Sequence, residues 1–266
     1  MSWTLFKANI KNNRLIWIIM TSIFSMYLII IVSMYDPDGA EVLNEMLKTL
    51  PEGLVNALGF NEMGTTLLTF IAGYIYGFLV LLFPMVLSII INHRIIGSLI
   101  DKGSMAFLLS TPNSRIRIAV TQALFSLFSI TMLFLFSTIF SIIISGAMFP
   151  GLLDIGTFIL INIYALLMYY AIGGIGFLAS CISTESKYSL GLGIGIPVGF
   201  LLLQMLGGVG EKLSWIGNFS LYTLFDPNKL IEGEPFAFIG MALFLLIAIV
   251  LYGAGIAIFN KRDLSV

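Results

Sequence analysis

Charge is the scarcest property of this sequence. Aspartate, glutamate, lysine and arginine make up 10% of its 266 residues, whereas 59% are hydrophobic. A charge at mid-bilayer costs at least ~2.5–3.5 kcal/mol and persists mainly where ions, protons or voltage are handled. Six runs contain no charged residue: Leu15–Tyr35, Leu67–Asn92, Ile118–Ala147, Ile155–Cys181, Ser189–Gly210 and Phe236–Asn260. This absence indicates a membrane protein whose driving force comes from outside the membrane.

Histidine and cysteine occur once each. With His93 as the sole histidine, a His-Glu-x-x-His motif, a multi-histidine metal site and a Ser-His-Asp triad elsewhere in the chain are all excluded. Cys181 cannot form an internal disulfide and fits a small buried apolar residue. The sequence also lacks a Gly-x-x-x-x-Gly-Lys-Ser/Thr phosphate loop. We therefore expect no catalytic residue, no metal site and no ATP hydrolysis by this chain itself.

The six runs predict an all-α polytopic membrane protein with six transmembrane helices. A hydrocarbon core of ~30 Å requires ~20 helical residues, and every run reaches that length. The alternating segments of ~10 residues that mark a membrane β-barrel are missing. At ~45 Å, the run Ile118–Ala147 must tilt or project from the bilayer. The first run is too long for the apolar region of a signal peptide.

The basic residues predict the orientation. With the first span starting inside, ten of the thirteen lysines and arginines fall on one side of the membrane. Basic residues in short loops mark the cytoplasmic face, so both termini are expected there. Eleven of the fourteen acidic residues fall on the opposite side. That acidic face reflects either ordinary solvation or the cargo that it meets.

Residues 1–14 form a predicted N-terminal interfacial helix ahead of the membrane domain 15–266. Apolar and basic residues repeat on separate helical faces, with Trp3, Phe6 and Ile10 on one and Lys7, Lys11 and Arg14 on the other. This pattern suits a helix lying on anionic headgroups of membrane lipids. The alternative is a basic flank that only sets orientation.

Two outer segments are long enough for structure of their own. Residues 36–66 contain a turn at Asp36–Gly39 and an apolar pattern that predicts one or two short amphipathic helices. Residues 211–235 mix aromatic residues with helix breakers, and Trp and Tyr favour the headgroup zone. Trp215, Phe219 and Tyr222 are therefore candidates for an outer, re-entrant gate, the alternative being an ordinary surface loop.

The loop 93–117 predicts a short helix on the cytoplasmic side. Gly103 ends the second span, Ser104 can cap a new helix, and Pro112 stops it. Asn113 or Ser114 can cap the next helix. The new helix has an apolar face formed by Met105, Leu108 and Leu109, with Phe107 beside it. A helix of two turns is unstable alone, so the membrane surface or a partner protein must hold this face.

The stretch Asp101–Arg115 resembles the cytoplasmic loop of ATP-binding-cassette (ABC) type-2 permeases. There an acidic and a basic residue precede Gly, Ser/Thr, hydrophobic residues, Leu-Leu, a small residue, Pro and a basic residue. The C-terminal Phe259–Leu264 is similar to the tail that often follows the last span in that family. The six-span plan, the N-terminal interfacial helix and the aromatic outer loop match as well, so the resemblance covers the whole chain.

The resemblance implies the transmembrane subunit of a type V ABC exporter in the bacterial plasma membrane. The short helix would be a coupling helix that docks on a separate cytoplasmic ABC ATPase, present in two copies and binding ATP and Mg. No cofactor is then expected on this chain, and no nucleic acid partner. The expected docking residues are Asp101, Gly103, Ser104, Met105, Phe107, Leu108, Leu109, Pro112, Arg115 and, in the second inner loop, Glu185.

Small residues and prolines in the second and fifth spans suggest close helix packing. We expect a dimer interface with a second permease chain, identical or homologous, or a substrate path. Static packing within one chain is the alternative. The candidate residues are Gly73, Gly77, Pro84, Gly191, Gly195, Gly199 and Gln204.

Charge-free spans offer no counter-ion for a strongly charged small solute. We therefore expect outward movement of amphipathic or hydrophobic substrates, with peptides or drugs favoured and lipids as an alternative. Two other classes stay open: an ATP-independent secondary carrier or flippase, and a non-transporting immunity or regulatory protein. The first would show ionisable residues at the midplane or interrupted helices in two related halves, and the second needs no ATPase docking helix.

Overall fold

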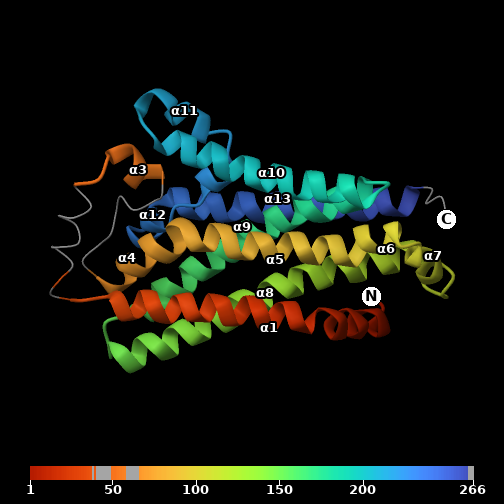
Figure 1. The fold of residues 1–266 in the computed structure, drawn as a ribbon, viewed down its shortest axis with the longest axis horizontal. Helices are drawn as coiled ribbons and strands as arrows, with labels where there is room; N and C mark the ends of the chain where they lie inside the picture. Colours follow the sequence, from red (N-terminus) through yellow and green to blue (C-terminus); the bar gives the residue numbers. More distant parts are fainter. Residues whose placement is uncertain (38, 40–48, 58–65, 263–266) are drawn as a thin grey trace.

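The computed structural model describes residues 1–37, 39, 49–57 and 66–262. Within these ranges it contains helices and no strand, so the all-α prediction is confirmed. Six helical spans lie side by side as a bundle (Figure 1). They are long and apolar enough to cross a membrane: Trp3–Met34, Leu67–Asp101, Arg115–Met148, Ile155–Ile182, Ser186–Gly208 and Pro235–Lys261.

Five spans are single helices, and the second is divided. The single helices are α1 (Trp3–Met34), α8 (Arg115–Met148), α9 (Ile155–Ile182), α10 (Ser186–Gly208) and α13 (Pro235–Lys261). The second span consists of α4 (Leu67–Ile71), π-helix η1 (Ala72–Leu79), α5 (Val80–Asn92), π-helix η2 (His93–Gly97) and α6 (Ser98–Asp101). Such π-helical turns are rare and are frequent at functional sites. The hydrophobic pattern does not reveal them.

Helix α8 is the longest element, with 34 residues. At 1.5 Å per residue it measures about 51 Å, more than the ~30 Å hydrocarbon core. It crosses α1 obliquely along the bundle (Figure 1). This arrangement agrees with the tilt or projection predicted for this long run.

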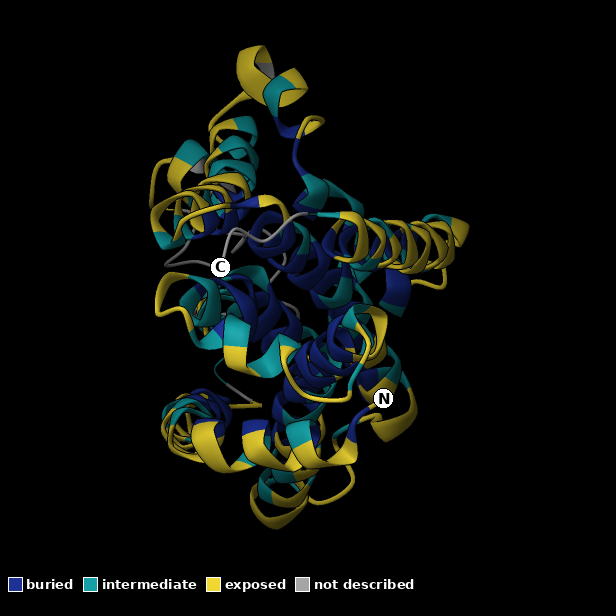
Figure 2. Cartoon of the chain, turned by 90° about the vertical axis from the view of Figure 1, so that its right-hand side faces the viewer, coloured by how far each residue is buried: buried dark blue, intermediate teal, exposed yellow. Residues whose placement is uncertain are grey.

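The first turns of α1 run across α8 rather than along it. The Ser2 amide donates to Thr121 Oγ1 at 2.7 Å, and the rings of Trp17 and Phe125 lie 5.6 Å apart. Ser2 and Trp17 are separated by about 22 Å in a straight helix, yet their partners on α8 are only one turn apart. Figure 2 shows the helix beside the N-terminus running across the view, in which the spans are seen end on.

Residues 3–14 are hydrogen-bonded continuously with the first span in α1, and an interfacial position for the segment 1–14 stays a prediction. On the predicted apolar face Trp3 is 58% exposed, whereas Phe6 is buried. The buried positions are Ser2, Phe6, Asn9 and Asn13. Asn9 Nδ2 donates to Gln122 Oε1 at 2.5 Å, so polar contacts with α8 decide which face turns inward.

Helix α9 lies at the centre of the bundle and carries much of the buried core. Buried residues gather in the middle of the end-on view, with exposed residues around the rim (Figure 2). The absence of a side chain at Gly176 allows close approach, since a Cβ there would lie 3.1 Å from Asn92 Nδ2 of α5. Close small-residue packing thus also occurs in the fourth span, whereas the sequence directed attention to the second and fifth.

The two ends of the bundle differ. Helix α7 (Ser104–Leu109) lies beside both chain termini, at what we call the terminal end (Figure 1). At the opposite, far end lie α3 (Glu52–Ala57), α11 (Ser214–Gly217) and α12 (Pro227–Ile231), with the short helices η3 (Glu211–Leu213) and η4 (Leu221–Leu224) in the same segment as α11 and α12. Of the helices predicted in 36–66, α3 is the part described. Residues 38, 40–48 and 58–65 lie outside the described residues.

Candidate functional site

The predicted coupling helix exists as α7, and a glycine creates it. Gly103 has φ +67°, a left-handed conformation that favours glycine, and it separates α6 from α7. The sequence predicted that Ser104 caps this helix with its side chain. Instead Ser104 is the first helical residue, and Gly103 holds the cap position. At the other end Ser110 Oγ donates to Phe107 O at 2.8 Å. The next helix, α8, is capped by Ser114, whose hydroxyl accepts from the Arg117 amide.

The apolar residues of α7 point in different directions. Met105 is 3% exposed and packs among buried side chains that include Ile95 and Ile118. Leu108 and Leu109 are half-buried against the same cluster. Met105 therefore anchors α7 to its own chain, and the docking role predicted for it stays a prediction.

Phe107 has the opposite environment. Its side chain is 79% exposed, the largest exposure among the large hydrophobic residues described. Because Met105 anchors the same helix, Phe107 is an exposed aromatic side chain held at the terminal end. Asp101, Gly103 and Pro112 are also exposed there.

Arginines connect the start of α8 to the ends of α9 and α13 at the terminal end. Arg115 Nη1 donates to Arg262 O at 2.6 Å, and Arg262 Nη1 donates to Cys181 O at 2.9 Å and to Ser183 O at 2.7 Å. Arg262 thus satisfies carbonyl groups at the C-terminal end of α9, which the helix itself leaves without donors. Arg115 holds the chain together at this point. A role in docking stays a prediction.

Glu185, the docking residue predicted in the second inner loop, precedes α10 and is exposed. Its carboxylate pairs with Lys187 Nζ at 2.7 Å. Because both side chains are solvent-exposed, the pair contributes little to stability. The carboxylate stays accessible at the same end of the bundle as α7.

A cavity of about 500 Å³ lies at the far end between η1 and α5, the end of α10 and the segment 211–235. Four predicted residues line it: Gly73, Gly77, Gln204 and Tyr222. The structure therefore brings together three candidates for the path and one for the gate.

The lining of this far-end cavity is mixed. Tyr76, Leu81 and Phe225 supply apolar surface. Amide and hydroxyl groups line the rest, from Gln204, Asn218, Thr223 and Asn228, together with the carboxylate of Asp226. Such a surface suits a ligand with both apolar and hydrogen-bonding parts.

The remaining predicted path residues lie elsewhere. Pro84 is buried inside α5 and does not line the cavity. Gly191 and Gly195 are exposed on α10, and a Cβ at either position would meet open space. Gly199 is half-buried with the same open space. These three glycines therefore do not serve packing within the described chain, although such packing was the alternative in the sequence analysis.

The predicted gate residues separate into two groups. Trp215 and Phe219 are exposed, and their rings lie 6.1 Å apart in an edge-to-face arrangement. Tyr222 is buried, and its hydroxyl donates to Met85 Sδ at 3.6 Å. Trp215 and Phe219 thus form an exposed aromatic pair, while Tyr222 attaches the segment to the second span.

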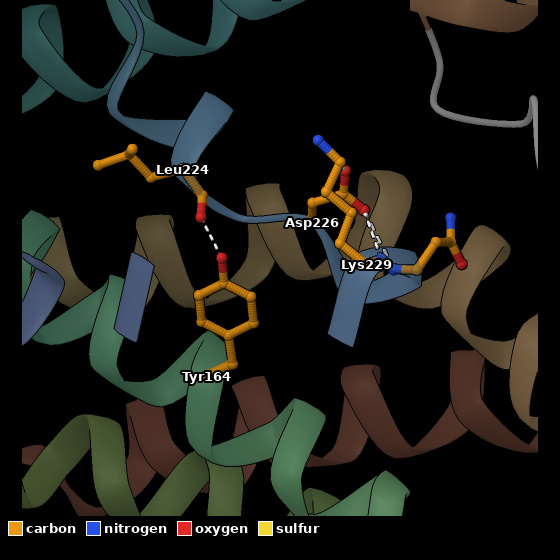
Figure 3. Close-up of polar contacts among 5 residues, drawn as sticks. Tyr164, Leu224, Asp226 and Lys229 are labelled. Atoms are coloured by element: carbon orange, nitrogen blue, oxygen red, sulfur yellow. Dashed lines mark hydrogen bonds and ion pairs between the residues drawn. The ribbon is translucent and has the colours of Figure 1, made fainter. Parts of the chain in front are cut away.

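Further hydrogen bonds fix the segment 211–235 on the bundle. The Tyr164 hydroxyl of α9 donates to Leu224 O, and Asp226 caps α12 while facing Lys229 (Figure 3). Thr223 Oγ1 donates to Gln204 Oε1 at 2.6 Å, which links η4 to α10. Most of this segment is therefore attached through side chains and backbone carbonyls.

One functional candidate was missed in the sequence. Asn92 joins three helices: its Nδ2 donates to Gly173 O at 3.1 Å, and its Oδ1 accepts from Ser126 Oγ at 2.8 Å. Ser126 also bonds the Tyr252 hydroxyl at 2.9 Å, which adds α13 to the network. The signal was a Ser88-x-x-x-Asn92 pair inside an apolar run, on one helical face. Asn162, another buried amide within a span, donates instead to Phe158 O of its own helix.

Comparison with protein families places these features in context. The chain matches the family described as "ABC-2 family transporter protein" over residues 3–264. Among curated proteins, none matches this chain. The family match covers nearly all of the chain, including α7, the cavity lining and the six spans, and the chain therefore belongs to the ABC-2 family of transporter proteins.

Proposed function

We propose that this membrane subunit of an ABC transporter works as an exporter permease and that a cytoplasmic ATPase docks on Phe107. The observation that carries this proposal is the contrast within α7, where Met105 is 3% and Phe107 is 79% exposed. Buried aromatic residues dominate binding energy at protein interfaces. A rigidly held, exposed phenylalanine suits insertion into a groove on the ATPase, and Glu185 supplies a second contact nearby.

The far-end cavity supports an amphipathic substrate. It combines aromatic surface from Tyr76 and Phe225 with amides from Gln204 and Asn218. The acidic face predicted on this side favours release of cationic cargo, so cationic amphipathic peptides or drugs are the substrates that we propose. Movement is from the terminal end, which is cytoplasmic in this proposal, to the far end.

A second permease copy completes the path. Helix α10 is the least buried of the six spans. Gly191 and Gly195 leave open space on its outer side, which allows another helix to approach closely. We propose a two-fold arrangement in which α10 contributes to the interface between the two permease chains and two ATPase subunits bind at the terminal end.

The test is ATP turnover by the reconstituted complex of this chain with its ATPase. Cationic amphipathic peptides, phospholipids, lipophilic dyes and hydrophilic sugars are compared as stimulants. We expect stimulation by the peptides or dyes and ATP-dependent loss of substrate from the compartment that contains ATP. Stimulation by sugars alone would contradict the substrate class. Transport without ATP would instead favour a secondary carrier. If no ATPase associates with the chain, the result would favour a non-transporting protein.

A further inference from the structure

A second cavity, of about 450 Å³, opens between α1, α5 and α8 near the terminal end. Its lining is apolar along most of its length, with Ile18, Leu87, Leu133 and Phe136 among the residues that form it. Nothing in the proposed transport cycle uses this groove, which shares no lining residue with the far-end cavity. Its volume falls within the range of small-molecule sites, about 300–1,000 Å³.

The side chain of Arg14 supplies a positive charge at the groove. Arg14 lines it and is exposed, and makes no hydrogen bond or ion pair with the residues that the structure describes. Lys11 lies one helical turn before Arg14 and is also exposed. The first 35 residues contain no aspartate or glutamate. The local charge of this stretch of α1 is therefore positive, without a neutralising carboxylate of its own.

An unpaired polar group lies in the wall of the groove. Trp17 lines the groove, and its buried indole Nε1 has no hydrogen-bond partner among the described residues. Buried N–H groups in proteins are nearly always paired, so this unpaired indole N–H is unusual. The Trp17 ring is fixed by Phe125 and Phe128, at 5.6 and 5.8 Å.

We propose that this groove binds one anionic phospholipid from the leaflet around the terminal end. An acyl chain fills the apolar length between α1 and α8, and the phosphate lies against Arg14. Arginine binds phosphate through paired hydrogen bonds, and the Trp17 ring forms part of the groove wall. The ligand must carry an acyl chain because the lining beyond Arg14 offers mainly hydrocarbon contact. This proposal does not depend on the transport function.

The experiment uses Trp17 fluorescence in the full chain. Phe at positions 3 and 215 (Trp3→Phe, Trp215→Phe) leaves Trp17 as the only tryptophan, and both replaced residues are exposed. The protein is reconstituted in phosphatidylcholine vesicles with a small fraction of phosphatidylglycerol or phosphatidylcholine brominated on the acyl chains. Bromine quenches tryptophan at contact, so the two lipids report on headgroup preference. We expect phosphatidylglycerol to reach half-maximal quenching at a several-fold lower fraction.

Variants separate a site from general lipid contact. Arg14→Gln is expected to abolish the preference for phosphatidylglycerol, whereas Lys102→Gln, which removes an exposed cation at the same end, keeps it. Thr21→Phe fills the groove and is expected to weaken quenching by both lipids. Equal quenching by the two lipids in the parent protein, or a preference that survives Arg14→Gln, would overturn the proposal. Circular dichroism verifies that each variant is folded.

Discussion

Arg115 and Arg262 are 147 positions apart, and the guanidinium of the first donates to the carbonyl oxygen of the second at 2.6 Å. Arg115 is the first residue of α8, and Arg262 follows the last span. Because Arg262 also donates to Cys181 O and Ser183 O, three segments of the terminal end meet at one point. These bonds therefore join the start of α8 to the ends of α9 and α13.

Replacing Arg262 by alanine should destabilise the protein. The substitution leaves Cys181 O and Ser183 O without their donor, and hydrogen bonds to charged groups contribute about 1.5–3 kcal/mol. Thermal unfolding in one detergent measures the change. Lys261→Ala is the control, because Lys261 is exposed and makes no such bond. Equal melting temperatures of the two variants would contradict a capping role for Arg262.

Asn92→Ala should destabilise the bundle by about 1–3 kcal/mol, since it leaves buried groups of α8 and α9 without a partner. Denaturant unfolding followed by circular dichroism checks this. Ser137→Ala is matched to it: Ser137 is buried too, but bonds only Leu133 O in its own helix. We expect that control to change stability by less than about 0.5 kcal/mol. A similar loss of stability in both variants would show that the hydrogen bonds of Asn92 to α8 and α9 make no special contribution.

Phe107→Ala should weaken ATPase binding without unfolding the chain. Truncation of an aromatic hot spot costs about 2 kcal/mol or more, which is a loss of roughly 30-fold in affinity. Co-purification and ATP turnover of the complex measure it. Ile116→Ala removes another exposed apolar side chain at the same end and should retain coupling. If α7 instead lies on lipid headgroups, Phe107→Ala will leave ATPase binding unchanged.

Cysteine at Gly195 should crosslink two permease chains, whereas cysteine at Gly193 should not. A side chain at 195 meets open space on the outer face of α10, while one at 193 faces the Gly176 backbone of the same chain. Cys181 is replaced by alanine first, to remove the native thiol. Non-reducing electrophoresis after mild oxidation detects the dimer. Crosslinking at both positions, or at neither, would contradict the proposed interface.

The start of α9 should become less stable in acid. Hydrogen bonds from the Thr157 hydroxyl and amide, and from the Gly156 amide, lower the pKa of Asp154 below its ordinary value. A carboxylate with a lowered folded-state pKa stabilises the protein above its unfolded pKa of about 3.9 and loses that effect as pH falls through the folded pKa. Asp154→Ala should therefore lower the melting temperature at pH 7, and the difference should shrink below pH 4. A pH-independent difference would refute this account.

Hydropathy and charge determined much of the fold from sequence alone. Six charge-free runs can satisfy their backbone in lipid only as helices, so the number of spans follows from solvation. The short helix at Ser104–Leu109 follows from the glycine and proline around it, because these residues act locally. Gly73, Gly77 and Gln204 line the far-end cavity, and their association with a substrate path stays a hypothesis.

Tertiary structure decided which side of each helix is used. Met105 and Phe107 are two residues apart and both apolar, so only the position of α7 against Ile95 and Ile118 buries one and exposes the other. Asn92 became a junction because α8 and α9 bring Ser126 and Gly173 O to it. Helices that are hydrophobic on all sides carry little information about their neighbours, since lipid and protein interior are equally apolar. The sequence alone therefore determined the spans, whereas packing determined the far-end cavity, the hydrogen bonds of Asn92 and the exposure of Phe107.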